Sequence, residues 1–319
     1  MNNTKKKSPI SWVPTAYFAM GLPFVVLNMV TVLMFKGLEV DDKLITFWTS
    51  LILLPWTLKP LWSPFLELFR TKKFFVIVTQ LITGVTFGLV AFALNLSHFF
   101  SISIALLAIV AFSGATHDIA CDGVYMSELS NEDQAKFIGW QGAFYNIAKI
   151  LATGGLVYLA GYFIELNADA GLLTANKRAW MIILLILSVT MILLGIYHLF
   201  ALPSTQSASS RKTLRSNKEV MKELGQVLMD FFRKTHITYY ICFFIILYRF
   251  AEGFVMKIVP LFLKADREMG GLGLNEKEIG LYYGTYGAAA FVLGSLLAGY
   301  YIARRGLKKT IFSLCCIFN

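Results

Sequence analysis

The sequence GATHDIACDGVYM, residues 114–126, places one histidine and two aspartates inside a stretch that is otherwise apolar enough to cross a membrane. The apolar stretch covers residues 99–127, more than the about 20 residues that a helix needs to cross a hydrocarbon core of about 30 Å. Ionisable side chains at that depth are tolerated where they face protein or water instead of lipid. We therefore expect a membrane helix whose polar face is turned toward the inside of the protein.

Similar apolar stretches recur along the whole chain. Hydrophobic residues make up 57% of it, charged residues 15%, and the mean hydropathy is +0.64, whereas ordinary soluble domains carry about 25% charged residues. The alternating pattern of membrane β-strands is absent, so the expected fold class is an all-α polytopic membrane protein. We expect eight spans, near residues 11–34, 44–64, 73–96, 99–127, 135–163, 179–201, 237–263 and 279–303.

A ninth apolar stretch starts at Thr310, and the sequence ends ten residues later at Asn319. A helix of that length reaches only about 15 Å, which is half of a membrane crossing. We therefore expect this sequence to be a fragment of a longer protein or the product of a truncated gene.

The net charge of +10 is explained by the distribution of Lys and Arg among the loops. Basic residues cluster in alternate connections, at 5–7, 70–73, 211–234 and 304–309, and are sparser in the others. Cytoplasmic loops of membrane proteins carry such an excess. The pattern predicts a cytoplasmic N-terminus, a lipid bilayer as the surroundings of the protein, and no nucleic-acid partner.

The longest loop divides the predicted spans into two sets. Residues 1–202 hold six spans, and residues 203–236 form a cytoplasmic linker that opens with a Ser-rich segment and continues into an amphipathic helix. Residues 237–319 hold spans seven and eight and the start of the ninth. Six spans, a polar linker and a second set are typical of a two-bundle transporter, here with a complete N-terminal and a partial C-terminal bundle.

Asp118 and Asp122 are the first candidates for a functional role. Four residues apart on a helix, they share one face within about 6 Å, where two ionised carboxylates repel each other. Either aspartate could therefore carry a coupling proton. Alternatively, both lie in water near the cytoplasmic end of the span, cap it, or pair with a lysine of a neighbouring helix. His117 is a candidate for substrate binding or a packed histidine, and no metal site is expected.

Span seven adds charges at membrane depth. Arg249 lies near the bilayer centre, where an unpaired guanidinium would be unfavourable by several kcal/mol. Glu252 is its expected ion-pair partner and a further proton-coupling candidate, because it lies three residues away on the same face. Binding an anionic substrate group is the stronger interpretation of Arg249. Lys257 lies nearer the outer side, where it could extend to the membrane surface or attract a substrate carboxylate.

Polar residues in spans five and eight complete the candidate substrate site. Gln141, Tyr145 and Lys149 recur every four residues and form a stripe that we expect to face the bundle interior. Tyr283 and Tyr286 could stack on a sugar or a peptide, or lie at the membrane interface as tyrosines often do.

Span one contains residues that favour a bend in the helix, and span two contains a lysine. Gly21 and Pro23 suggest a bend that opens or closes a cavity. Lys59, near the cytoplasmic end of span two, is expected to extend to the membrane surface or to pair with Glu67.

Several of these stretches resemble AmpG-type muropeptide permeases of the major facilitator superfamily, and GYYIARRGLKK at 299–309 is similar to a basic loop of that superfamily. Where these permeases usually have Gln-Asp-Ile, this chain has His117, Asp118 and Ile119. The other matching stretches are YFAMGLPFVV at 17–26, KPLWSPFLELF at 59–69, SGATHDIACDGVYMSEL at 113–129, LMDFFRK at 228–234 and LYRFAEGFVM at 247–256.

The resemblance implies a proton-driven symporter of the inner membrane that takes up anhydro-muropeptides, anionic sugar-peptides released during cell-wall turnover, without a cofactor. It also implies that spans one, four, seven and ten line a central cavity. Related acetyl-CoA transporters share the Asp-x-x-x-Asp pattern, so another anionic solute is the alternative substrate.

Two functions of other classes remain open. The first is a membrane-embedded transferase with Asp118 and Asp122 as metal ligands, although such enzymes need a further acidic cluster and an upstream Arg that the preceding segment lacks. The second is a scaffold or sensor without transport. We expect a transporter and not an enzyme.

Overall fold

A computed structural model describes residues 7–69, 71–203 and 236–290 and, singly, positions 222, 225, 226, 229, 233, 293, 294, 301, 304, 305, 309 and 310. Within these residues all the regular secondary structure is helical, which confirms the all-α polytopic fold. The predicted linker, its amphipathic helix and the start of the ninth span fall mainly outside the described residues.

Six helical segments of the described chain are long and apolar enough to cross a membrane, and they correspond to the first six predicted spans. Three of these segments contain more than one helix. The helices are α1 (Val13–Val25), α2 (Thr31–Gly37), α3 (Asp42–Leu51), α4 (Leu54–Phe69), α5 (Lys72–Ala93), α6 (Phe99–Glu128), α7 (Asn131–Ile150), α8 (Val157–Leu166) and α9 (Leu172–Ala201).

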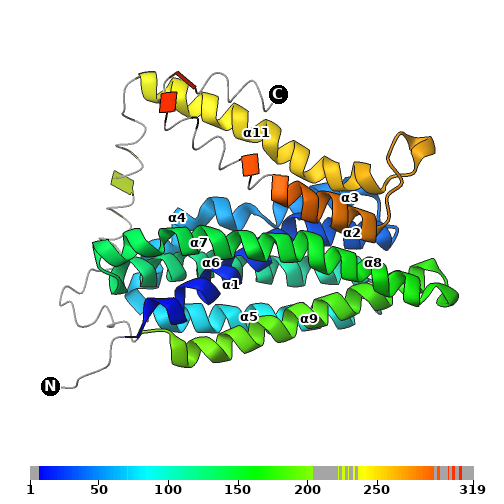
Figure 1. Ribbon diagram of the computed structural model, residues 1–319, viewed down its shortest axis with the longest axis horizontal. Coiled ribbons are helices and arrows are strands. Elements are labelled where there is room, and N and C mark those ends of the chain that lie inside the picture. The colour runs from blue at the N-terminus through cyan, green and yellow to red at the C-terminus, as the bar shows by residue number, and fades with distance from the viewer. Residues whose placement is uncertain are drawn as a thin grey trace.

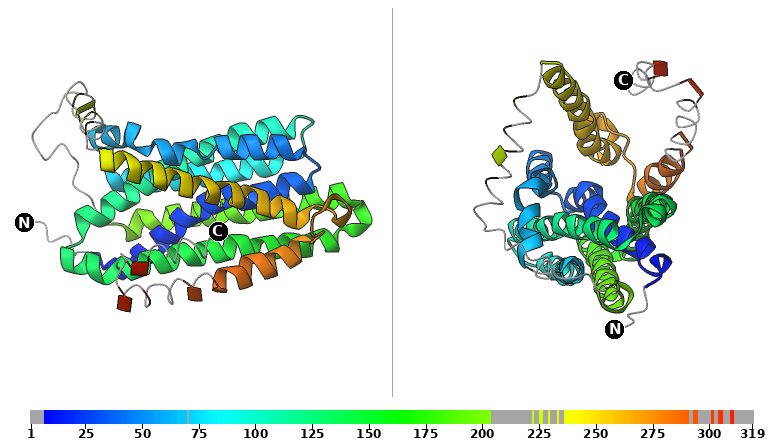
Figure 2. Two further views of the ribbon diagram at one scale, coloured as in Figure 1. Left: turned by 90° about the horizontal axis from the view of Figure 1, so that it is seen from above. Right: turned by 90° about the vertical axis from the view of Figure 1, so that its left-hand side faces the viewer.

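The seventh predicted span is helix α11 (His236–Lys264), which is 29 residues long. Its later part packs against α2 and α3, while its first turns stand away from the six-span bundle (Figures 1 and 2). The eighth span begins with α12 (Glu276–Ile279) and continues into a π-helical segment. The loops near α2 and α3, between α8 and α9 and after α11 lie at one end of the molecule, called here the α2–α3 end.

The core of the six spans is built from large apolar side chains. Helix α5 packs between α6 and α9, and α1 packs along α7. Trp180, Phe35 and Phe87 are fully buried among these helices. Phe92 and Phe112 point outward and are more than half exposed, as expected for side chains that face lipid.

Three spans contain π-helical segments in place of a regular α-helix, at Val26–Val30, Leu151–Leu156 and Gly280–Tyr286. In span one this change follows Pro23, which lies inside α1 and has no N–H to donate. The bend that Gly21 and Pro23 suggest, opening or closing a cavity, stays a prediction. A π-helical turn frequently marks a functional position, and all three segments contribute to the cavity described below.

Spans five and eight touch through glycines. A Cβ atom at Gly154 would lie 2.6 Å from the Thr285 hydroxyl, and one at Gly280 would lie 2.5 Å from the Tyr158 nitrogen. At Gly284 the added atom would overlap the backbone of Thr153. These small residues allow the two backbones to approach closely, as in other packed membrane helices. Nearer the α2–α3 end, Lys277 of α12 pairs with Glu165 of α8.

We predict that Gly284→Ala destabilises the protein by about 1–3 kcal/mol, because the added methyl group has no space against span five. Gly139→Ala is the matched control, since a Cβ there meets nothing within 4 Å and Ala favours a helix by about 1 kcal/mol. Thermal unfolding in detergent should move in opposite directions for the two variants. A rise in the unfolding temperature of both would contradict this packing.

Candidate functional site

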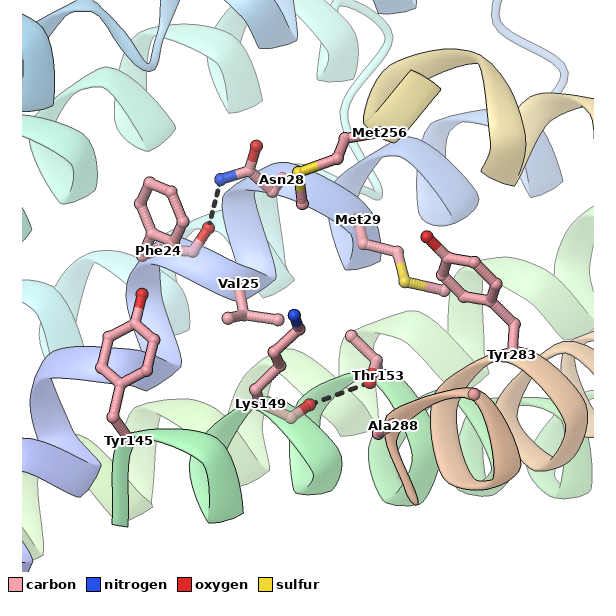
Figure 3. Close-up of a pocket in the computed structure, with 11 residues that line it drawn as sticks. Phe24, Val25, Asn28, Met29, Tyr145, Lys149, Thr153, Met256, Tyr283 and Ala288 are labelled. Atoms are coloured by element: carbon pink, nitrogen blue, oxygen red, sulfur yellow. Dashed lines mark hydrogen bonds between the residues drawn. The ribbon is translucent and has the colours of Figure 1, made fainter. Parts of the chain in front are cut away.

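A cavity of about 280 Å³ lies between spans one, five, seven and eight (Figure 3). Most of its wall is apolar, and the polar side chains on it are few, which is typical of a small-molecule site. The residues that line it are Phe24, Val25, Asn28, Met29, Tyr145, Lys149, Thr153, Met256, Tyr283, Gly287 and Ala288.

Span five supplies the cation of this cavity. Tyr145, Lys149 and Thr153 follow one another at four-residue steps, so they share the face turned to the cavity. Figure 3 shows the Lys149 ammonium extending from span five toward the middle of the cavity. The Thr153 hydroxyl donates to the Lys149 carbonyl oxygen at 2.9 Å, which links the last turn of α7 to the following π-helical segment. The arrangement places a positive charge beside a phenol on an otherwise apolar surface.

The structure brings together three of the predicted substrate residues, namely Tyr145, Lys149 and Tyr283. Tyr286 is not among the lining residues; its side chain is exposed, and its ring lies 6.2 Å from that of Tyr282. Gln141 belongs to the predicted stripe but bonds elsewhere. Its amide nitrogen donates to the Tyr17 hydroxyl at 2.9 Å.

Asp118 lies inside the bundle in an ion pair that bridges two spans. Its Oδ2 atom accepts from the Lys59 ammonium at 2.7 Å and from the Trp56 indole nitrogen at 2.9 Å. The other oxygen of the carboxylate is buried without a hydrogen-bond partner among the described residues. The predicted alternative of a lysine partner therefore fits Asp118. Lys59 therefore pairs with Asp118, and the prediction that it extends to the membrane surface or pairs with Glu67 is wrong.

Asp122 lies one turn beyond Asp118 in a different environment. The Tyr17 hydroxyl donates to its Oδ1 atom at 2.8 Å, so Gln141, Tyr17 and Asp122 form a chain of hydrogen bonds that joins three spans. Asp122 is exposed, whereas Asp118 is 7% exposed. Both aspartates lie on α6, but Asp118 is buried and Asp122 is exposed.

No residue of α6 is on the wall of this cavity, and the expectation that span four lines a central cavity stays a prediction. Instead, α6 packs against α1, α4 and α5. Trp56, which donates to Asp118, contacts the Phe24 ring edge-on at 5.3 Å, and Phe24 lines the cavity. The ion pair is therefore connected to the cavity through two aromatic rings.

His117 lies in a separate buried network and not at the cavity. Its Nε2 atom is 2.9 Å from the Gln80 amide nitrogen, and the Gln80 oxygen is 2.8 Å from His198 Nδ1. His198 Nε2 is 2.9 Å from the Thr15 hydroxyl. This chain joins four spans, and it supports the packed interpretation of His117.

Four residues of these networks were not predicted: Gln80 and His198, and Trp56 and Tyr17 as partners of the aspartates. A signal for the first two was present, because a polar side chain in an apolar span is itself evidence of an interior position. Trp56 and Tyr17 gave no such signal, since aromatic residues are common in membrane helices.

The two charged residues predicted at the centre of span seven cannot be placed in the site. Arg249 and Glu252 belong to helix α11, but their side chains lie outside the described part of the chain. In the described residues no group of three or more His, Cys, Asp or Glu side chains is placed to hold a metal ion.

The helical architecture and the intramembrane charges are those of a membrane transport protein. Residues 15–318 match the Major Facilitator Superfamily, and the chain belongs to this family of multi-pass membrane proteins. Anhydromuropeptide permeases of Escherichia coli K12 and O157:H7 are each 24% identical to it over 302 residues. The alignments cover 92% of this chain and 55% of each relative, so the chain spans about half the length of the curated relatives it matches.

A solved structure shows the same fold. The bacterial homolog of the human lysosomal transporter Spinster, in an inward-facing and unoccupied conformation, aligns with a TM-score of 0.64 at 13% identity. The alignment covers 96% of this chain and 64% of that chain. The predicted major-facilitator fold is confirmed.

We predict that Asp118 and Lys59 stabilise the bundle as a pair. Asp118→Asn and Lys59→Met should each lower the free energy of unfolding by about 2 kcal/mol, between the values for exposed and fully buried pairs. The double variant should lose clearly less than the sum, because neither charge is then left alone. The control is Lys136→Met, which removes an exposed pair with Glu132 and should change stability by less than about 0.5 kcal/mol. Additive losses at Asp118 and Lys59 would contradict the pairing.

Proposed function

We propose that this protein is a secondary active transporter of the inner membrane that couples proton movement into the cell to the uptake of anhydro-muropeptides during cell-wall recycling. The observation that carries the proposal is the Asp118–Lys59 ion pair, which aromatic contacts join to a cavity containing Lys149. The similarity to anhydromuropeptide permeases supports this substrate class. The permeases are transporters, and we assign no enzymatic reaction to this chain.

The cavity fits the chemistry of a small-molecule sugar-peptide with negative charge. The Lys149 ammonium is suited to a substrate carboxylate, because a charge-assisted hydrogen bond is stronger in a site from which water is partly excluded. The rings of Tyr145 and Tyr283 offer flat apolar surfaces with a hydroxyl, on which a sugar ring can lie. Arg249 remains a proposed second cation on span seven. Acetyl-CoA or another sugar-peptide conjugate would meet the same groups and is the alternative substrate.

The proposed orientation places the N-terminus in the cytoplasm and the α2–α3 end outside the cell. The glycine contacts of spans five and eight then close the outer side, and the first turns of α11 stand away from the bundle on the cytoplasmic side. Alternating access would open the outer side and close the cytoplasmic side. The division into a six-span bundle, a linker and a second bundle is part of this proposal.

Asp118 is the proposed site of the coupling proton. Protonation would remove its charge and release Lys59, which frees α4 from the electrostatic contact with α6. Trp56 and Phe24 would transmit the change to the cavity wall. Asp122 is exposed, and with Tyr17 and Gln141 it would connect Asp118 to the cytoplasmic water. Glu252 remains a proposed further participant on span seven.

We predict that liposomes containing the protein accumulate labelled anhydro-muropeptide only with an inward proton gradient. Asp118→Asn retains an acceptor for Trp56 but cannot alternate in charge, so it should abolish the gradient-driven accumulation and preserve exchange of internal for external substrate. Equal accumulation with and without the gradient in the wild type would contradict proton coupling. Full accumulation by Asp118→Asn would remove the role assigned to this residue.

We predict that Lys149→Met raises the KM for an anionic muropeptide about tenfold or more, which corresponds to the loss of one charge-assisted hydrogen bond. Lys136→Met is the matched control, since this lysine pairs with Glu132 on an exposed surface and should leave the KM unchanged. An unchanged KM for Lys149→Met would exclude this lysine from the substrate site.

A further inference from the structure

Lys257 is a buried cation that neither the cavity nor the Asp118 ion pair uses. Its side chain is 7% exposed and lies in the later part of α11. The Lys257 ammonium donates to the backbone carbonyl oxygens of Asn28 and Thr49, at 3.3 Å each. No acidic side chain of the described chain forms an ion pair with it. The expected extension to the membrane surface does not occur.

The two carbonyl oxygens lie at breaks in regular helices. Asn28 is in the π-helical segment Val26–Val30 of span one. Thr49 is near the end of α3, where the nitrogen of Leu53 bonds to Ser50 and not to Thr49. A carbonyl oxygen has two lone pairs, so near a break in a helix it can accept from a donor outside its own helix. The Lys257 ammonium is such a donor to both.

These contacts join two parts of the transporter that must separate. Lys257 belongs to span seven and its two acceptors belong to spans one and two, and in the described residues α11 packs against α2 and α3 at the α2–α3 end. In the proposed orientation, this is the outer side of the membrane. Opening that side moves span seven away from spans one and two, and the ammonium then loses both carbonyl oxygens and becomes exposed to the open pathway.

Lys257 also lies next to the cavity. Met256, its neighbour in sequence, lines the cavity, and so does the side chain of Asn28, whose carbonyl accepts from Lys257. A solute that enters between spans one, two and seven would therefore meet this ammonium beside the cavity.

We propose that Lys257 binds a carboxylate group of the incoming substrate when the outer side is open. The Asn28 and Thr49 carbonyls replace that carboxylate when the outer side is closed and the site is empty. Two neutral acceptors at 3.3 Å are weak partners for an ammonium with three donors, whereas a carboxylate offers a shorter, charge-assisted bond. The inference rests on the proposed transport of an anionic solute, and it adds a binding residue on the outer approach to the cavity.

The test compares initial uptake of two probes from outside: an anhydro-muropeptide, and the same molecule with its carboxylates converted to carboxamides. The wild type should prefer the carboxylate form at least about tenfold, as one charge-assisted hydrogen bond allows. Lys257→Met should reduce this preference at least fivefold, Lys257→Arg should retain it, and Lys136→Met serves as the surface control. If Lys257→Met lowers uptake of both probes equally, the residue has only a structural role and the proposal is wrong.

A second measurement needs no substrate. Spin labels on Cys introduced at the exposed positions Lys43 and Met269 report the separation of spans two and seven at the outer side. Lys257→Met should shift the distances toward the closed arrangement, because an apolar side chain loses no hydration on burial. A shift toward longer distances, or none, would overturn the proposal. A wild type that transports neither probe contradicts the proposed function, and the spin-label distances then test Lys257 independently.

Discussion

The structure depends on the electrostatic constraint that a carboxylate inside an apolar bundle must have a partner. Asp118 satisfies it through Lys59 and Trp56, which come from a different span. The contact fixes α4 against α6, and it can be released by a single proton. A purely apolar contact would hold these helices equally well, so the retention of a charged pair at this depth favours a role in coupling over one in stability alone.

The described contacts between spans one to six and the later helices lie toward the α2–α3 end. Glycine packing joins spans five and eight, the Lys277–Glu165 pair reinforces it, and Lys257 joins span seven to spans one and two. The cavity with Lys149 lies beside these contacts. A molecule closed at one end beside a pocket of this kind is one of the two arrangements that alternating access requires.

Membrane spans and fold class were predictable because about 20 consecutive apolar residues have few alternatives to a membrane helix. The four-residue spacing of Tyr145 and Lys149 placed both on the correct face, because helix geometry alone determines that. Partners were harder to predict. Whether Lys59 meets Asp118 or Glu67 depends on how separate helices rotate and tilt, and their sequence spacing contains no such information. The same holds for the contact of Gln80 with two histidines.

Infrared difference spectroscopy of the protein in membranes can follow the charge of Asp118, whose band is identified by comparison with Asp118→Asn. We predict that adding substrate under an inward proton gradient produces a protonated carboxyl band that is absent from the Asn variant. Lys59→Met should show this band without substrate. An Asp118 carboxylate that stays ionised under all of these conditions would exclude it as the site of the coupling proton.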